Sequence, residues 1–178
     1  MAMLRNQHGF TLIELLAVLV IFMLLIFSVS FVFITAQRLY VAGSQQSGLH
    51  NDLRLTAEKI IRELRFAYYL EILDESVWDI EAIDTSEYSY IYLDRSTNTI
   101  VQIDDTGSHA LSSNSITDVS FVGNVSTVLF TLHGESGGQA YSLDSSVRLL
   151  NYRCNFHNPD NPIALRYSLD PDFLIPGS

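Results

Sequence analysis

Cysteine is almost absent from this sequence. Cys154 is the single cysteine among 178 residues, which excludes an intrachain disulfide and any zinc cluster built from cysteines. One thiol indicates no particular redox compartment. We expect Cys154 to be a small, partly buried apolar residue, and we favour this over a catalytic nucleophile.

Basic residues are also few. The chain has 10 Lys and Arg against 20 Asp and Glu, and a formal net charge of -10. Residues 51–178 alone carry 8 basic and 19 acidic side chains, a difference of 11 negative charges. A domain this acidic repels the phosphate backbone of nucleic acids, so we expect no direct nucleic-acid binding.

The sequence lacks the motifs of common catalytic and metal sites. No HExxH pattern occurs, and the glycine-rich stretch at 134–138 has no phosphate-binding lysine, so we predict a hairpin loop there. Five histidines are scattered without close pairing and are expected on surfaces or loops: His8, His50, His109, His133 and His157. We therefore predict a chain that is not an enzyme and that uses no cofactor or metal.

One oxygen-rich segment leaves an alternative open. Asp104 and Asp105 lie in an Asp-Asp-Thr-Gly-Ser stretch that could bind calcium. The EF-hand spacing is absent, so we favour an exposed acidic turn.

What the sequence does have is one long apolar run. Between Phe10 and Ile34 it is interrupted only by Thr11, Glu14 and two serines. A stretch of this size can span a bilayer. A cleaved secretory signal has a shorter apolar region of about 7–15 residues, and this run also carries a carboxylate near its start. We therefore predict a membrane helix.

Glu14 is the costly residue in this helix. An acidic side chain inside a membrane helix costs roughly 2.5–3.5 kcal/mol even on the lenient insertion scale, so a positively charged partner is expected. A cut between Gly9 and Phe10 would create such a partner, because Phe10 would then carry a free α-amine about one helical turn from Glu14. The amine of a neighbouring subunit would serve equally well.

The order of residues at this point carries a family resemblance. His8-Gly9-Phe10-Thr11-Leu12-Ile13-Glu14-Leu15-Leu16, preceded by a leader containing Arg5, resembles the processing motif of type IV prepilins. The resemblance implies that Gly9 precedes the bond cut by a prepilin peptidase and methyltransferase. Phe10 would become the N-methylated first residue, and Glu14 would neutralise an N-terminal amine during assembly. Many major pilins have a helix-kinking proline here, whereas residues 10–37 contain none.

The resemblance also implies partners and a location. The partners would be the peptidase, other pilin or pseudopilin subunits, and an inner-membrane assembly platform. We expect a single-pass protein of the inner membrane, with the leader in the cytoplasm and the bulk of the chain outside it. After assembly it would reside in a pilus or pseudopilus.

An amphipathic helix is predicted after the apolar run. Apolar residues recur at steps of three and four from Leu49 to Ala67, with charged residues on the other faces. We expect this stripe to pack on the protein's own sheet. Gly43 and Gly48 leave open whether the two helical parts are continuous. One helix from Phe10 to about Tyr69 would be roughly 90 Å long.

The rest of the sequence is typical of antiparallel strands. Residues 88–93 and 99–103 predict a hairpin, and further strands are expected at 116–122, 126–132 and 140–151. Tyr88, Tyr90 and Tyr92 would share one side of a strand, where a half-buried sheet face is favoured over an adhesive patch. All four prolines lie in residues 152–178, which we predict to be an irregular C-terminal extension.

The sequence thus predicts an α+β, pilin-like fold, with a long N-terminal helix packed on an antiparallel β-sheet head. Its expected parts are a leader at 1–9, a transmembrane and assembly helix at 10–36, an amphipathic second half at 37–70, the head at 71–151, and the extension at 152–178. The predicted function is that of a minor subunit of a type IV pilus or of a pseudopilus for type II protein secretion or competence. The alternative is a membrane-anchored binding protein that does not polymerise.

Overall fold

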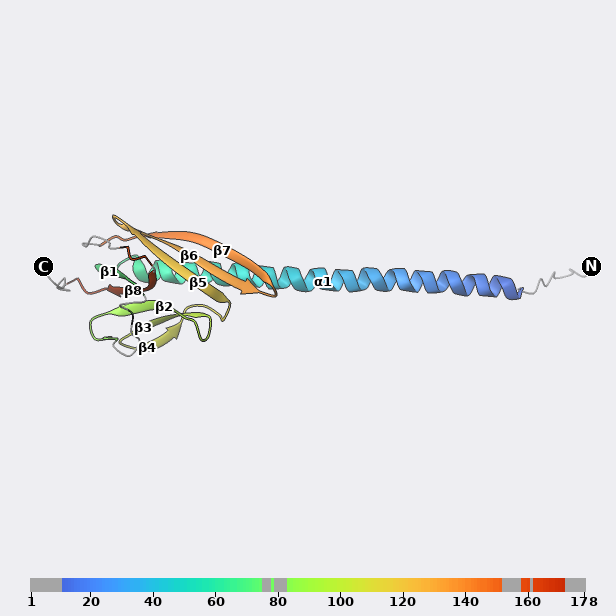
Figure 1. Cartoon of the computed structure of the whole chain (residues 1–178), viewed down its shortest axis with the longest axis horizontal. Helices are drawn as coiled ribbons and strands as arrows, with labels where there is room; N and C mark the ends of the chain where they lie inside the picture. Colours follow the sequence, from blue (N-terminus) through green and yellow to red (C-terminus); the bar gives the residue numbers. More distant parts are fainter. Residues whose placement is uncertain (1–10, 75–77, 79–82, 152–157, 161, 172–178) are drawn as a thin grey trace, which may run out of the picture. The chain divides into compact units, whose positions relative to one another are not determined.

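The computed structural model describes residues 11–74, 78, 83–151, 158–160 and 162–171. Its contacts divide the chain into two compact units, residues 1–44 and residues 45–178, and we call the second unit the head. Helix α1 (Leu12–Leu64) begins in the first unit and ends in the head (Figure 1).

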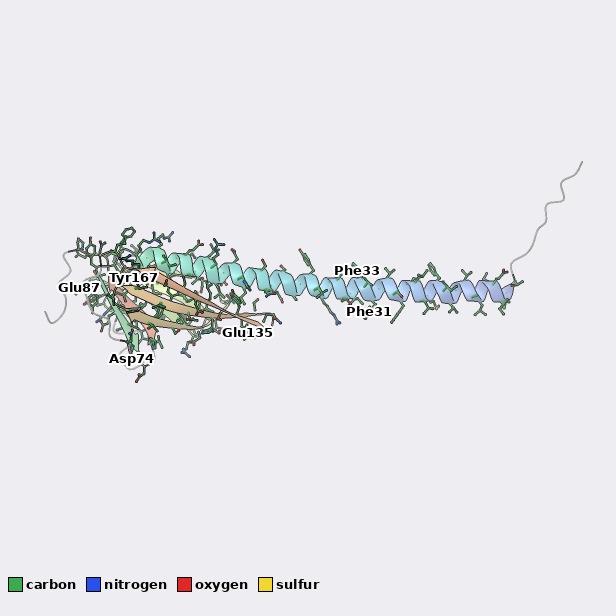
Figure 2. All side chains as sticks on the ribbon, turned by 90° about the horizontal axis from the view of Figure 1, so that it is seen from above. Phe31, Phe33, Asp74, Glu87, Glu135 and Tyr167 are labelled. Atoms are coloured by element: carbon green, nitrogen blue, oxygen red, sulfur yellow. The ribbon has the colours of Figure 1, made fainter. Side chains whose placement is uncertain are left out.

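The first unit is the N-terminal part of α1, and its side chains stand out on all sides of the helix (Figure 2). Two of its hydroxyl groups bond within the helix: Ser28 Oγ donates to the Leu24 carbonyl at 2.9 Å, and Thr35 Oγ1 donates to the Phe31 carbonyl at 2.9 Å. These internal bonds lower the cost of placing the two hydroxyl groups in an apolar environment.

In the head, α1 buries the predicted stripe. The buried helical residues recur at three- and four-residue steps, as expected for one face of a helix: Leu49, Leu53, Thr56, Ala57, Ile60 and Leu64. The helix passes through Gly43 and Gly48 without a break. It ends at Leu64, however, so the predicted helical span of 37–70 was too long: residues from Tyr69 onward form a strand instead.

Five antiparallel strands form the first sheet of the head. Their order is β1-β8-β2-β3-β4. Their bounds are β1 Tyr69–Asp74, β2 Ser89–Asp94, β3 Thr99–Asp104, β4 Gly107–Ala110 and β8 Pro162–Ser168. The predicted hairpin is β2–β3, with Asp94 opposite Thr99 at its turn.

Three antiparallel strands form the second sheet, in the order β5-β6-β7. Their bounds are β5 Ile116–Asn124, β6 Thr127–Ser136 and β7 Gln139–Arg148. Burial alternates along β6, so one face of this sheet packs inward and the other faces solvent. These strands lie where the sequence predicts them, and the prediction of a helix packed on antiparallel sheets is confirmed.

The main core joins the helix stripe to both sheets. Its fully buried members include Ile60 of α1, Ile91 and Tyr167 of the first sheet, and Phe121 and Leu132 of the second. Burying each such side chain contributes on the order of 1.5–3 kcal/mol. The helix end and the two sheets are therefore held together as one folded body, the head.

A second, smaller cluster lies around the predicted tyrosine strand. Tyr90 and Tyr92 are 5% and 8% exposed, and both rings pack beside Trp78, with the Tyr92 ring centroid 4.8 Å from that of Trp78. Tyr88 is partly buried, under the guanidinium of Arg166 at 4.6 Å. The interpretation as a half-buried sheet face is confirmed.

The C-terminal segment requires a correction. Residues 152–178 were predicted to be irregular, yet β8 lies in the middle of the first sheet, between β1 and β2. Pro162 is tolerated because it is the first residue of the strand. The sequence signal of this strand is weak, because the β-prone run from 163 to 167 is short and has prolines on both sides. Its partner strand β1 is distant in the sequence, with Tyr69 opposite Ser168.

Cys154 lies outside the described residues, so the prediction of a partly buried apolar residue stays a prediction.

Candidate assembly site at the start of helix α1

The first turn of α1 is closed by two residues that hydrogen-bond each other. The Thr11 backbone N–H and the Thr11 hydroxyl both donate to Glu14 Oε2, each at 3.1 Å, and the Glu14 backbone N–H donates to Thr11 Oγ1 at 3.4 Å. This is a capping box, in which Thr11 is the N-cap and Glu14 the third helical residue. The carboxylate also lies at the positive end of the helix dipole.

Glu14 was predictable from the sequence as an assembly residue, whereas the part played by Thr11 was not predicted. The signal was present, because a threonine followed three residues later by glutamate at the head of an apolar run is the pattern of a capping box. The other two predicted residues, Gly9 and Phe10, lie outside the described residues. The prediction that they form a processing site therefore stays a prediction.

The surface behind this cap is almost entirely apolar and is exposed. Every large apolar side chain from Leu12 to Ile34 is at least 50% exposed. Within the described part of the chain, α1 is a helix long and apolar enough to cross a membrane, and none of its most apolar stretch is buried. Exposed apolar surface on this scale requires lipid or other helices to cover it.

Glu14 uses only one of its two carboxylate oxygens. Both bonds from Thr11 end on Oε2, and among the residues that the structure describes no donor contacts Oε1. A carboxylate has about four lone-pair positions, so Oε1 can accept further hydrogen bonds. The cap and an additional ionic contact are therefore compatible.

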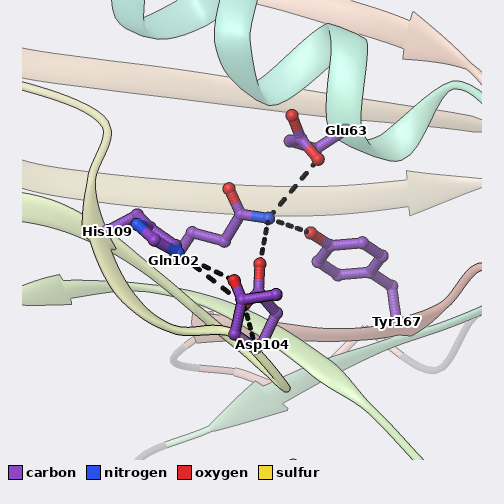
Figure 3. Close-up of polar contacts among 6 residues, drawn as sticks. Glu63, Gln102, Asp104, His109 and Tyr167 are labelled. Carbon is purple, nitrogen blue, oxygen red and sulfur yellow. Dashed lines mark hydrogen bonds and ion pairs between the residues drawn. The ribbon is translucent and has the colours of Figure 1, made fainter.

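In the head, a buried polar network joins the last turn of α1 to the first sheet (Figure 3). Gln102 of β3 is 9% exposed, and its Nε2 donates to Tyr167 Oη of β8 at 3.0 Å. The same nitrogen approaches Glu63 Oε2 at 3.4 Å and Asp104 Oδ2 at 3.5 Å. Burial raises the pKa of the Tyr167 phenol above its ordinary value, and the nearby charge of Glu63 raises it further.

The acidic turn at Asp104 and Asp105 is organised by hydrogen bonds of its own. The Thr106 hydroxyl and backbone N–H donate to the Asp104 carboxylate, and the Thr106 hydroxyl keeps the pKa of that carboxyl below its usual value. Asp105 is exposed. Within the described residues no three His, Cys, Asp or Glu side chains come together as metal ligands.

Comparison with known families identifies the N-terminal segment. Residues 4–30 match the family described as the prokaryotic N-terminal methylation motif. This match covers the cap, Glu14 and most of the apolar run. The chain thus carries the N-terminal motif of type IV prepilins. Its predicted resemblance to prepilins is thereby confirmed, and so is the presence of the methylation motif.

Two solved structures share the fold of this prepilin-like chain. The minor pilin PilB from Streptococcus sanguinis matches with a TM-score of 0.54 and 15% identity, over 74% of this chain and 36% of that one. A D319A mutant of the same pilin matches with a TM-score of 0.54 and 20% identity, over 77% and 36%. The chain thus corresponds to about a third of these proteins. No curated protein matches it significantly.

These comparisons support a structural role of the type IV pilin kind. The exposed apolar helix is consistent with anchoring in a membrane.

Proposed function

We propose that this chain is a minor subunit that a prepilin peptidase cuts after Gly9 and that then polymerises through its N-terminal helix. The filament is a type IV pilus or a pseudopilus of type II secretion or competence. The observation that carries this proposal is the methylation motif at the head of a fully exposed apolar helix, with Glu14 in its first turn.

The charge of Glu14 supports a role in assembly. After the cut, Phe10 carries a free and then methylated amine, and Glu14 is the acidic group in the first turn of the helix. Its Oε1, which accepts no bond from the described residues, is available to an incoming amine while Oε2 stays within the cap. Pairing the two opposite charges lowers the cost of holding Glu14 in an apolar environment.

The apolar surface supports the proposed location and partners. Residues 10–36 span the cell membrane before assembly, and the remainder of the chain lies outside the cytoplasm. In the filament, the helices of other subunits replace lipid around α1, at an inner-membrane assembly platform. A head with two sheets and no cysteine-bracketed loop suits a minor subunit better than a bulk one.

Filament recovery tests this function. Cells with a complete filament machinery are sheared, and the chain is sought in both the filament and membrane fractions. We expect wild type in the filament fraction and Gly9→Val in the membrane fraction alone. Gly43→Val is the matched control, because an added Cβ at Gly43 meets nothing within 4 Å. Wild type found only in membranes, with a working machinery, would favour an anchored binding protein that does not polymerise.

A further inference from the structure

A small pocket lies at the C-terminal end of α1. Its volume is about 300 Å³, and it is lined by Glu58, Ile61, Arg62, Arg65 and Phe66. Phe66 is 53% exposed although it is a large aromatic residue. Exposed aromatic and arginine side chains around a hollow are the residues most often found at the centre of protein interfaces.

Backbone hydrogen bonds place the segments of two other exposed apolar residues near the end of α1. The Leu150 N–H donates to the Arg65 carbonyl at 2.9 Å, and the Leu149 N–H donates to the Ser126 carbonyl at 2.8 Å. The β5–β6 turn and the end of α1 accordingly lie at the same end of the head (Figure 1). Leu150 is 61% exposed and Val125, in that turn, is 83% exposed.

We call these residues together the α1-end surface: Ile61, Arg62, Arg65, Phe66, Val125 and Leu150. Its apolar side chains come from three segments that backbone hydrogen bonds hold next to one another, and it includes two arginines. Apolar patches rimmed by polar groups mark interaction sites on protein surfaces.

The backbone of Val125 is an independent indication. Its φ is +52°, in the left-handed region that a β-branched residue rarely adopts. Asn124 pairs with Thr127, so Val125 is the first of two loop residues, a position where glycine or asparagine would be unstrained. An exposed valine held in this conformation gives the head no core packing. Strain of this kind clusters at functional positions.

Charge indicates what the surface binds. Among the described residues, no carboxylate pairs with Arg65, whereas Glu58 is held by Arg54 at 3.1 Å and Arg62 approaches Glu63 at 3.4 Å. Four of the eight basic residues of 51–178 lie between positions 54 and 65. The rest of the head is correspondingly acidic, so a second copy of this chain presents mostly carboxylates.

We propose that the α1-end surface docks the acidic end of the first sheet of a second copy, through Glu87 and Asp105. Both residues are exposed, and neither has an ion pair within the described part of the chain. Glu87 precedes β2 and Asp105 follows β3, and the pairing of Tyr90 with Ile103 places these ends side by side. Arginine binds a carboxylate through two parallel hydrogen bonds.

The two surfaces of this contact are different, so the contact is heterologous and joins one copy to the next head to tail. The proposal thus rests on the proposed function, since it names a contact between heads within an assembly. Its failure can be told apart from that of the function, because processing after Gly9 is measured by the mass of the N-terminus and not by contacts of the head.

Self-association of the full chain tests the proposal. The protein is held in excess detergent micelles, and its dissociation constant is measured by analytical ultracentrifugation at low and high salt. We expect wild-type association to weaken with salt, as contacts between exposed charges do. Arg62→Glu together with Arg65→Glu should weaken it at least about tenfold, as loss of arginines central to an interface does. Arg95→Glu is the matched control, an exposed arginine on the β2–β3 turn, and should change it little.

Two further variants separate docking from misfolding. A Glu87→Arg and Asp105→Arg chain, mixed with the Arg62→Glu and Arg65→Glu chain, should restore association to near the wild-type constant. Val125→Gly should raise the unfolding temperature by relieving the backbone and yet weaken association several-fold. Association unchanged in the arginine variant, equal loss in the Arg95→Glu control, or no restoration in the mixture would each overturn the proposal.

Discussion

Glu14 receives both hydrogen bonds of Thr11 on a single oxygen. The Thr11 N–H and hydroxyl converge on Oε2, each at 3.1 Å. One carboxylate therefore has two separable tasks: its cap needs an acceptor, whereas its proposed contact with an amine needs a charge. A side chain that supplies the hydrogen-bond acceptor without the negative charge can separate capping from assembly.

We predict that Glu14→Gln retains the cap and loses assembly. A glutamine oxygen can still accept from Thr11, as in the general capping box, but it cannot neutralise an amine. The variant should be processed at the wild-type rate and be missing from sheared filaments. Thr11→Ala should lose about 1 kcal/mol of helix-start stability and still enter filaments. Equal incorporation of Glu14→Gln and wild type would contradict the charge argument.

Gln102 should contribute more to the stability of the head than an exposed glutamine does. Gln102→Leu removes the buried donor that Tyr167, Glu63 and Asp104 share, and leaves groups unsatisfied at a cost of about 1–3 kcal/mol. Urea unfolding of the full chain in detergent measures this. The control is Gln139→Leu at the exposed start of β7, which should change stability by less than about 0.5 kcal/mol. Similar losses in both variants would show that the network contributes nothing specific.

Two glycines should respond to alanine in opposite directions. An added Cβ at Gly48 meets nothing within 4 Å, so Gly48→Ala should stabilise the head by about 0.5–1 kcal/mol through the better helix propensity of alanine. At Gly134 the Cβ would lie 2.8 Å from Leu49 Cδ1 and 3.0 Å from the Ser115 carbonyl oxygen. Gly134→Ala should destabilise by about 1–3 kcal/mol. The midpoint of urea unfolding is measured for both variants and for the wild type. A higher midpoint for Gly134→Ala than for the wild type would contradict the close packing at Gly134.

The head should lose stability in alkali. Burial raises the pKa values of Tyr69 and Tyr167 above the ordinary 10.0. A raised pKa gives stability that is complete below the unfolded value of 10.0 and is lost as pH rises through the folded value. The urea midpoint should therefore fall from pH 9 to pH 11. Tyr167→Phe should be less stable at pH 9 yet show a smaller fall, and an identical fall in both proteins would exclude this cause.

The fold was largely predictable where the sequence signal is local. The stripe from Leu49 to Leu64 has the period of a helix, and the β2–β3 and β5–β6–β7 runs are separated by turn residues. The strand β8 was not predictable in this way. Its place between β1 and β2 depends on pairings such as Tyr69 with Ser168, about a hundred residues apart, and prolines surround it.

The candidate sites were likewise predictable only where the sequence signal is local. Glu14 was predictable because a charged side chain inside an apolar helix is costly unless it has a partner, but the capping role of Thr11 was overlooked. The α1-end surface could not be predicted from sequence. Phe66, Val125 and Leu150 lie far apart in the sequence, and backbone contacts between three segments bring those segments together.

The mass of the N-terminus tests most directly whether the chain is cut after Gly9 as a prepilin. The full chain is expressed with and without an active prepilin peptidase, next to a Gly9→Val variant, and intact mass and N-terminal sequence are measured. We predict a peptidase-dependent start at methylated Phe10 that is lost in Gly9→Val. A chain that still begins at Met1 or Ala2 in the presence of active peptidase would contradict it.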